Sequence, residues 1–258
     1  MYNPDELKAL LTLDAFPRSA GYDPDWVGTN LMGPNVLWLT EWLTQRVRLE
    51  PGMRVLDLGC GTAISSIFLA KEFGVEVWAA DLWIDPGENW QRICEAGVER
   101  RVFPLRAEAH ELPFAGGFFD AALSMDAYQY FGTSDTYLPY YLKFLKTGAE
   151  LGIVVPSVKE EFERVPEHLK DYWEADNWCF RSPAWWRHHW AKTGLVGDVT
   201  ADWLEDGWEQ WLLWHEVGRD QGYGFYEAEM NALKEDAGRN LGFTRVVATK
   251  RQLTGERP

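Results

Sequence analysis

Residues 54–66 read RVLDLGCGTAISS and place an acidic side chain at the start of a glycine-rich turn. An apolar run leads up to Asp57, and Gly59 and Gly61 follow ahead of a segment that has the composition of a helix. Such a turn lets a ligand approach the backbone closely, and the helix N-terminus beside it usually favours an anion. Asp57 would repel an anion at this place. The pattern therefore favours a ligand that carries an ammonium or sulfonium charge.

Two common phosphate-binding motifs do not fit this turn. A P-loop requires a lysine within GxxxxGK[ST], and the segment has none. The dinucleotide fingerprint G-x-G-x-x-G has its first two glycines at Gly59 and Gly61, but Ile64 occupies the third position. Asp81, which ends the next apolar run, would suit the ribose of NAD as well as that of another nucleoside. An NAD-dependent oxidoreductase therefore stays open as an alternative.

Histidines and cysteines give no sign of a metal site. The histidines are His110, His168, His188, His189 and His215. They show neither HxH nor HExxH spacing, so we expect no metal. The cysteines, Cys60, Cys94 and Cys179, have no CxxC spacing and are odd in number, which favours free thiols in a reducing cytosol. If a general base exists, His189 and His168 are the first candidates, and His215 is the next.

Strands and helices must alternate to position these residues. We expect strands at 53–58, 75–80, 101–106, 118–124, 150–155, 195–201 and 243–251. We expect helices at 33–47, 62–73, 89–96, 135–145 and 183–193, with mostly helical sequence from there to about 238. Alternation of this kind predicts βαβ units and a parallel sheet that is covered on both faces. The segment 157–181 does not follow this rhythm and has the character of an insertion.

Four segments resemble, in order, the motifs of class I S-adenosylmethionine-dependent methyltransferases of the small-molecule type. VLDLGCGTA resembles their motif I, and WAADLW contains Asp81, where the family keeps an acid that takes both ribose hydroxyls. AEAHELPF (107–114), FFDAALSMDAYQYF and LKTGAELGIVVP resemble the later motifs. The resemblance covers about 33–156 and points to the ubiquinone/menaquinone, sarcosine/dimethylglycine and phosphoethanolamine methyltransferases. It implies a doubly wound α/β fold, a Rossmann-like, mostly parallel sheet of seven strands whose last strand is antiparallel.

The resemblance also implies how the chain is organised. We expect a single methyltransferase domain over 1–258, with N-terminal lid helices in 1–50 and a cofactor-binding core in 51–156. A cap insertion with helices and one core strand would occupy 157–240, and the terminal strand 241–258.

S-adenosylmethionine is the cofactor that the resemblance implies, with S-adenosylhomocysteine as product. The cofactor-binding residues would be Asp57, Gly59, Gly61, Asp81, Leu82, Glu108, Ala109 and Met125. Asp81 would hold the ribose, Glu108 the adenine amino group, and the Ala109 backbone would read the ring. Gly33 and Asn35 fall where relatives close over the methionine end.

The segment SMDAYQYFG (124–132) is similar to the Ser–x–Asp–Ala segment of glycine, sarcosine, dimethylglycine and phosphoethanolamine methyltransferases. By that resemblance Asp126 would hold a substrate amine, and it is a catalytic candidate together with His189. The alternative is that Asp126 only caps a turn at the end of the strand. Tyr128 and Tyr130 are predicted as substrate contacts or as wall.

Fifteen tryptophans are several times the usual share, and most lie in the second half of the chain. Packing between a helical, Trp-rich cap and the sheet is the expected role of most of them, and Trp186 and Trp190 stand i,i+4 on a predicted helix. Trp173 and Trp178 lie outside any clear helix and are predicted to contact the substrate from a lid. There they would form an aromatic cage for a flat ring or a methylated ammonium.

Composition narrows the partners. The formal net charge is −15, which disfavours nucleic acid and anionic membranes. No apolar run approaches the ~20 residues of a spanning helix, and MYNPDELKALL lacks the basic start of a secretory signal. We therefore expect a cytoplasmic monomer or homodimer that methylates a small molecule at N, O or C, with an amine favoured. A non-catalytic S-adenosylmethionine-binding protein and an NAD-dependent oxidoreductase are the alternatives.

Overall fold

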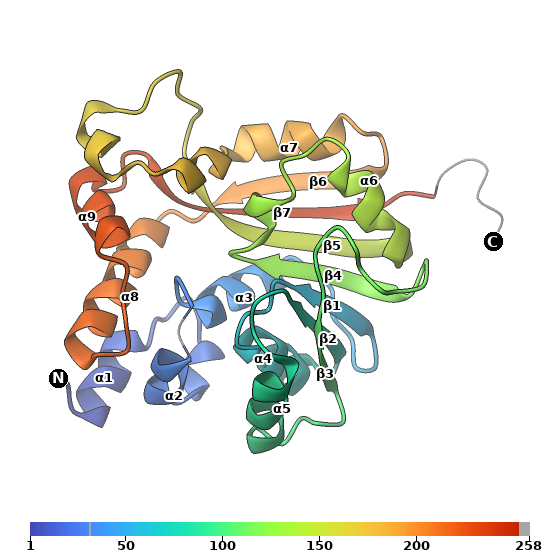
Figure 1. The fold of residues 1–258 in the computed structure, drawn as a ribbon, viewed down its shortest axis with the longest axis horizontal. Coiled ribbons are helices and arrows are strands. Elements are labelled where there is room, and N and C mark those ends of the chain that lie inside the picture. Colours follow the sequence, from blue (N-terminus) through green and yellow to red (C-terminus); the bar gives the residue numbers. More distant parts are fainter. Residues whose placement is uncertain (31, 253–258) are drawn as a thin grey trace.

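The computed structural model describes residues 1–30 and 32–252, and in this part of the chain seven strands form one sheet. Their order is β3-β2-β1-β4-β5-β7-β6 (Figure 1). The strands are β1 Arg54–Leu58, β2 Glu76–Asp81, β3 Val102–Arg106, β4 Phe119–Met125, β5 Leu145–Val158, β6 Val196–Trp203 and β7 Leu241–Lys250. The first five are parallel, and β7 lies antiparallel between β5 and β6. This confirms the predicted fold class.

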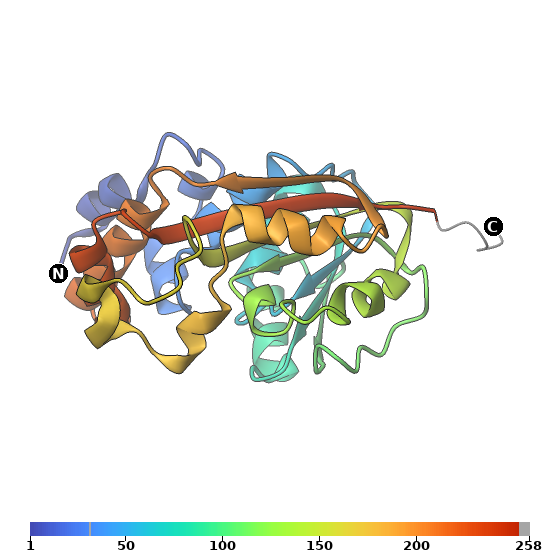
Figure 2. The same ribbon diagram turned by 90° about the horizontal axis from the view of Figure 1, so that it is seen from above.

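Helices cover both faces of the sheet (Figures 1 and 2). One face carries α3 Val36–Thr44, α4 Ile64–Phe73 and α5 Pro86–Glu95, and the other carries α6 Tyr137–Tyr141 and α7 Pro183–Ala191. Successive strand residues point to opposite faces, so Val55 of β1 joins the first core and Leu56 joins the second. Both faces of the parallel strands are therefore buried, as the apolar strand sequences predict.

Four helices gather at one end of the molecule, beside the carboxyl ends of the parallel strands (Figure 1). They are α1 Pro4–Leu11, α2 Pro24–Thr29, α8 Gly207–Gln221 and α9 Glu227–Asp236. The residue Tyr2, just before α1, contacts the end of α8, where the Tyr2 N–H donates to Gln221 Oε1 at 2.6 Å. The inserted segment 157–181 forms two short 3₁₀ turns here, η4 Glu167–Tyr172 and η5 Ala175–Cys179.

Tryptophans fill the two cores where packing was expected. Trp186 and Trp190 of α7 and Trp211 and Trp214 of α8 are all at most 4% exposed. The packing role predicted for these four is confirmed. The part of the predicted terminal strand from 253 to 258 lies outside the described residues.

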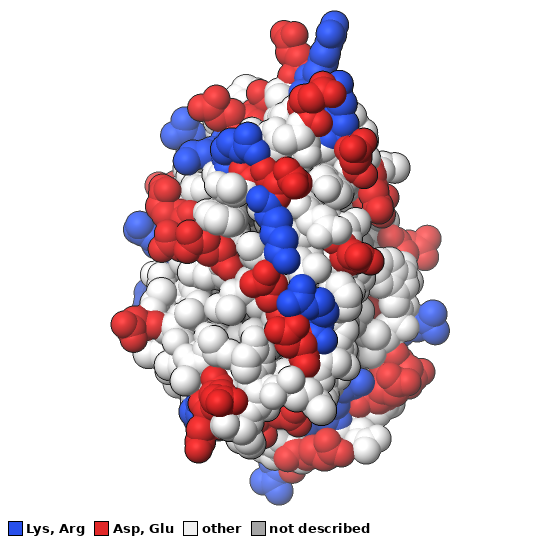
Figure 3. Space-filling model, turned by 90° about the vertical axis from the view of Figure 1, so that its left-hand side faces the viewer, with Lys and Arg blue, Asp and Glu red and all other residues white. Residues whose placement is uncertain are grey.

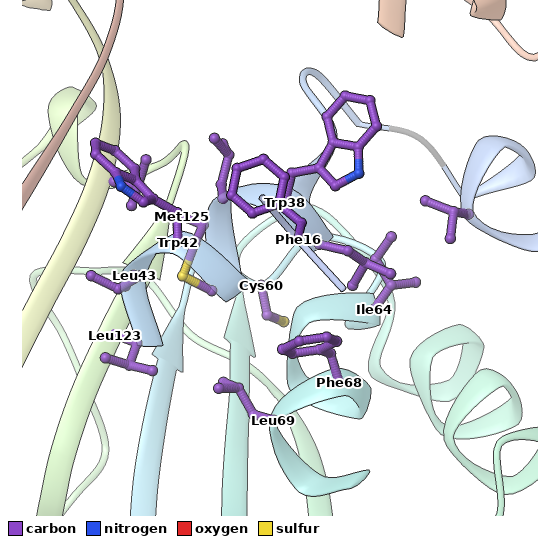
Figure 4. Close-up of a cluster of buried hydrophobic side chains, with 14 of the residues drawn as sticks. Phe16, Trp38, Trp42, Leu43, Cys60, Ile64, Phe68, Leu69, Leu123 and Met125 are labelled. Atoms are coloured by element: carbon purple, nitrogen blue, oxygen red, sulfur yellow. The ribbon is translucent and has the colours of Figure 1, made fainter. Parts of the chain in front are cut away.

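Apolar side chains gather around α3, above the carboxyl ends of β1 and β4 (Figure 4). Trp38 and Trp42 come from α3, and Cys60 and Met125 come from the strand ends. The Met125 side chain is 3% exposed and belongs to this core. The Met125 side chain is therefore not exposed to a ligand in this structure, and its role in cofactor binding stays a prediction.

Candidate functional site

The glycine-rich turn lies where the ends of β1, β2 and β4 meet. Gly59 and Gly61 have φ values of +75° and +53°, a region that favours glycine. A β-carbon on Gly59 would also lie 2.3 Å from the Ala127 β-carbon, so a side chain has no room there. The Gly59 N–H donates to the Ala80 carbonyl at 2.8 Å, which ties the turn to β2.

Asp81 connects the end of β2 to this turn. Its Oδ2 accepts the Gly61 N–H at 2.8 Å, and its Oδ1 accepts the N–H groups of Trp83 and Ile84 at 2.8 and 3.0 Å. A carboxylate offers about four acceptor positions, so capacity for a hydroxyl donor is left. Leu82, partly exposed, places an apolar side chain beside it.

Asp57 is fully buried beneath the turn. Its Oδ2 accepts the hydroxyls of Ser65 and Ser66, at the start of α4, at 2.7 and 2.6 Å. Its Oδ1 has no hydrogen-bond partner among the residues described. Burial raises the pKa of Asp57 to about 6, against the opposing effect of the two hydroxyls. Asp57 therefore links the strand end to the start of α4 and keeps one unpaired oxygen.

The N-terminal segment lies over the turn. The Thr62 hydroxyl donates to the Asn30 carbonyl at 2.8 Å, and Arg92 Nε donates to Asn30 Oδ1 at 2.7 Å. Met32 brings its sulfur to 3.1 Å from where a β-carbon of Gly61 would stand. These contacts hold a cover over the glycines.

Gly33 continues this cover and reaches Asp126. Gly33 has a φ of +91°, and the Trp214 indole N–H donates to its carbonyl at 3.1 Å. Asn35 is buried and caps α3 by accepting the Leu37 N–H at 3.1 Å. Gly33 thus lies near the expected site, whereas the Asn35 side chain serves as a helix cap.

Asp126 follows β4 and adopts a left-handed backbone conformation with a φ of +53°. Its Oδ1 accepts Gln129 Nε2 at 3.2 Å, and no backbone N–H of the described residues donates to its carboxylate. The alternative of a turn cap therefore lacks the bond that defines a cap. Burial, and next the negative charge of Glu229, raise the pKa of Asp126 well above its ordinary value.

Tyr128 and Tyr130 have opposite environments. Tyr128 has no exposed surface and packs among Tyr137, Trp186 and Trp190 at ring distances of 5.5 to 5.9 Å. The predicted substrate contact at Tyr128 is therefore corrected to a core position. Tyr130 is 56% exposed and remains available to a ligand.

Glu108 faces solvent beside His110. Its Oε1 lies 2.9 Å from His110 Nδ1, its Oε2 accepts the His110 N–H at 2.7 Å, and the imidazole bond lowers the pKa of Glu108. The Ala109 carbonyl accepts the Tyr137 hydroxyl at 3.1 Å. The adenine contacts of Glu108 and Ala109 stay predictions.

His189 lies in a buried position beside Trp185. The ring is 3% exposed and stacks on Trp185 at 4.4 Å, and its Nε2 donates to the Gly132 carbonyl at 3.1 Å. Burial lowers the pKa of His189. The other ring nitrogen, Nδ1, is buried and has no hydrogen-bond partner among the described residues, and the role of His189 as a catalytic base stays a prediction. His168 is likewise bound to Asp236, with Nε2 3.0 Å from Oδ1.

A cavity of about 400 Å³ opens between the η4–η5 segment and α9. It is lined by Tyr130, Tyr172, Glu174, Asp176, Asn177, Phe180, Trp211, Phe225, Tyr226, Glu227, Ala228, Glu229, Ala232, Leu233 and Leu241. Trp173 and Trp178 are not among these residues. They pack on each other at 5.8 Å, and Trp173 supports Phe180 at 6.2 Å. Nothing in the sequence indicated this cavity, because its walls come from separate segments between Tyr130 and Leu241.

Among the described residues, no group of three or more His, Cys, Asp or Glu side chains is arranged to hold a metal ion. Within the same part of the chain, no helix has the length and apolar character needed to cross a bilayer.

Residues 55–148 match a family model described as a methyltransferase domain. The chain is 29% identical over 189 residues to the 2-methyl-6-phytyl-1,4-hydroquinone methyltransferase of Synechocystis, covering 68% of this chain and 58% of that protein. The matches cover 58%, 48% and 29% of the length of three of the curated relatives.

Two solved structures share the fold. Phosphoethanolamine N-methyltransferase 2 of Haemonchus contortus, in complex with phosphomonomethylethanolamine and S-adenosylhomocysteine, has a TM-score of 0.72 at 20% identity. The match covers 95% of this chain and 61% of that chain. A geranyl diphosphate methyltransferase in complex with S-adenosylmethionine has a TM-score of 0.69 at 17% identity, over 94% of each chain.

Proposed function

We propose, from the premise that this chain belongs to the class I S-adenosylmethionine-dependent methyltransferases, that it transfers a methyl group to a small molecule. S-adenosylmethionine is the donor and S-adenosylhomocysteine the product. The position of Asp81 carries the proposal. Its carboxylate stands at the end of β2, 2.8 Å from the Gly61 N–H, with acceptor capacity left and the apolar Leu82 beside it.

The residues of the turn fit this cofactor. Asp57 has an unpaired buried oxygen, which suits the ammonium of a methionine moiety. Gly59 and Gly61 carry no side chain, so the cofactor can approach the backbone of the turn closely. Two carboxylates, Asp57 and Asp81, lie at this turn, and their negative charges disfavour a pyrophosphate.

When bound, S-adenosylmethionine supplies an electrophilic methyl carbon: an acceptor lone pair bonds to it while the carbon–sulfur bond breaks and its electron pair stays on sulfur. The chain's residues bind, orient and exclude water. Asp81 would bind the ribose through its remaining acceptor capacity, and Asp57 would hold the ammonium through the turn. The cover formed by Met32 and Gly33 would keep water from the sulfonium.

The acceptor's nucleophile is placed at Asp126, and an amine is favoured. A protonated amine must release one proton before its lone pair can attack. A carboxylate whose pKa is raised by burial and by the charge of Glu229 is suited to accept that proton. Asp126 is thus the proposed catalytic residue, with Tyr130 as a wall of the acceptor site.

Calorimetry with S-adenosylhomocysteine tests the cofactor site. We expect Asp81→Ala to weaken binding at least about tenfold, because charge-assisted hydrogen bonds are lost. Asp81→Asn, which keeps an acceptor for the Gly61 N–H, separates the ribose contact from the integrity of the turn. Glu99→Ala, at an exposed acid, is the control. Unchanged affinity in both Asp81 variants would overturn the assignment.

The alternatives give different results in the same experiments. An oxidoreductase would bind NAD in preference to S-adenosylhomocysteine. A non-catalytic binding protein would bind the cofactor and give no homocysteine-containing product with amines, phenols or keto acids. A cytoplasmic location, a monomeric or homodimeric state and the absence of nucleic-acid partners stay predictions.

A further inference from the structure

We propose that the cavity between the η4–η5 segment and α9 is the acceptor site and takes a small aliphatic amine that carries neither phosphate nor carboxylate. The inference rests on the proposed function and names its substrate class. It also separates this chain from the phosphomonomethylethanolamine-bound structure that shares its fold.

The charges that line the cavity are of one sign. Glu174, Asp176, Glu227 and Glu229 contribute carboxylates, and no Lys, Arg or His is among the lining residues. Figure 3 views the molecule from this end and shows groups of acidic side chains on the face, with basic side chains between them. A phosphate or carboxylate on the acceptor would meet only like charges here, whereas an ammonium group would be attracted.

Aromatic side chains complete the lining. Tyr130, Phe180, Trp211 and Tyr226 belong to it, and rings of this kind attract ammonium groups through their faces. The Trp211 side chain is 4% exposed, and its indole N–H has no hydrogen-bond partner among the described residues. A buried donor of this kind can be satisfied by a polar group of a ligand, such as the hydroxyl of an amino alcohol. The volume of about 400 Å³ suits a small molecule.

Glu229 is the proposed anchor for the ammonium group. The Tyr226 N–H donates to His215 Nδ1 at 3.4 Å, so Nδ1 is unprotonated and Nε2 carries the proton. His215 is fully buried, and its Nε2 lies 3.0 Å from Glu229 Oε2, to which it donates. The His215 imidazole thus fixes the position of the Glu229 carboxylate. The remaining acceptor positions of Glu229 are available to a cation.

The cavity adjoins the proposed site of methyl transfer. Tyr130, which lines the cavity, belongs to the 3₁₀ turn η2, Tyr128–Tyr130, directly after Asp126. Glu229 lies close enough to Asp126 for its charge to help raise the pKa of the latter. Tyr130 thus connects the cavity wall to the segment that carries Asp126, the proposed catalytic carboxylate.

Binding of tetramethylammonium tests the cavity without chemistry. We expect saturable binding by calorimetry in the presence of S-adenosylhomocysteine, weakened at least fivefold in Glu229→Gln, which keeps an acceptor for His215. Glu227→Gln, at another lining carboxylate, should weaken binding to a smaller extent. Glu235→Gln is the matched control, because it makes the same change on the same helix at an exposed position outside the cavity. No binding, or equal binding by Glu229→Gln and Glu235→Gln, would overturn the inference.

Three matched acceptors test the substrate class. With labelled cofactor we expect kcat/KM for N,N-dimethylethanolamine to exceed that for its phosphate ester and for N,N-dimethylglycine at least tenfold. A preference for either acidic compound would overturn the inference. The two proposals fail separately: loss of S-adenosylhomocysteine binding contradicts the proposed function, whereas intact cofactor binding without tetramethylammonium binding contradicts only the acceptor site.

Discussion

Gly33 and Asp126 approach so closely that a β-carbon on Gly33 would stand 2.6 Å from Asp126 Oδ2. Two segments about ninety residues apart in sequence are thereby brought together at the end of β4. The position requires glycine for a second reason, because its φ is +91°. The cover over the glycine-rich turn and the proposed catalytic carboxylate are thus fitted to each other.

Gly33→Ala is therefore expected to impair function more than folding. The new methyl group must displace the Asp126 carboxylate, and we expect kcat/KM to fall at least about tenfold, with a stability loss of about 1–2 kcal/mol from the strained backbone. Gly21→Ala is the control, because a β-carbon there meets no atom within 4 Å. Steady-state kinetics and urea unfolding measure the two effects, and a fully active Gly33→Ala would contradict the contact.

The buried carboxylate of Asp57 predicts a pH dependence of stability. Its pKa is about 6 in the folded protein and about 4 in the unfolded chain. Between these values the folded state holds a proton that the unfolded state has released, so the free energy of unfolding falls as the pH rises. The expected loss is about 3 kcal/mol between pH 4 and pH 7.

Asp57→Asn should remove this contribution. Urea unfolding of both proteins at pH 4.5 and pH 7 measures it, and the variant should gain stability relative to the unchanged protein at the higher pH. We also expect weaker binding of S-adenosylhomocysteine, because the carboxylate charge is lost. If the variant and the unchanged protein differ in free energy of unfolding by the same amount at both pH values, the burial of an ionised Asp57 is excluded.

Tyr128→Ala and Tyr130→Ala should separate core from site. Tyr128 is fully buried among aromatic rings, so its truncation should cost about 3–5 kcal/mol. Tyr130 is 56% exposed and lines the cavity, so its truncation should cost less than about 1 kcal/mol and raise the KM for the acceptor. Thermal unfolding and kinetics give both readouts. A larger loss of stability in Tyr130→Ala than in Tyr128→Ala would contradict the assignment of Tyr128 to the core and Tyr130 to the site.

Asp236 should hold the cavity wall in place. Its carboxylate accepts the N–H groups of Asn240 and Leu241 at 2.7 and 2.8 Å and bonds to His168, which joins α9 to the start of β7 and to η4. Burial opposes ionisation, but these bonds lower the pKa of Asp236 overall. Its stabilising effect is thus present at neutral pH and is lost as the pH falls below about 4.

We expect Asp236→Ala to destabilise the protein by about 3 kcal/mol at pH 7, because buried donors are left unpaired. The same variant should differ less from the unchanged protein at pH 3. Urea unfolding at the two pH values measures this, with Glu235→Ala as the neighbouring control. A penalty that is independent of pH would argue for a purely steric role.

The sheet could be predicted because its signals are local. Each strand that positions Asp57, Asp81 or Asp126 is a short apolar run with an acid at or next to its carboxyl end, and the motif order supplied the topology. The helices α1 and α2 were not predicted individually, although Pro4 and Pro24 mark their first turns. Strand β5 begins earlier than expected, at Leu145 instead of 150, and passes through Gly148.

The acceptor site could not be predicted in the same way. Glu229 lies in YEAEMNALKED, which has the pattern of an ordinary amphipathic helix, and only its contact with His215 distinguishes it. Tyr128 and Tyr130 differ in environment although they are two positions apart, because the 3₁₀ turn sends one ring into the core. His189 was a candidate by residue type alone, and tertiary packing directed its proton to the Gly132 carbonyl.

Cys60 stands between the two glycines of the turn, with its side chain in the apolar cluster of Figure 4. Burial, and then the nearby carboxylates, raise the pKa of its thiol well above the ordinary value, which keeps it in the unreactive form. Alkylating reagents and peroxides will therefore modify the exposed Cys94 first. The slow rate at which Cys60 is labelled would then measure how often the glycine-rich turn opens. A bound nucleoside should reduce this rate.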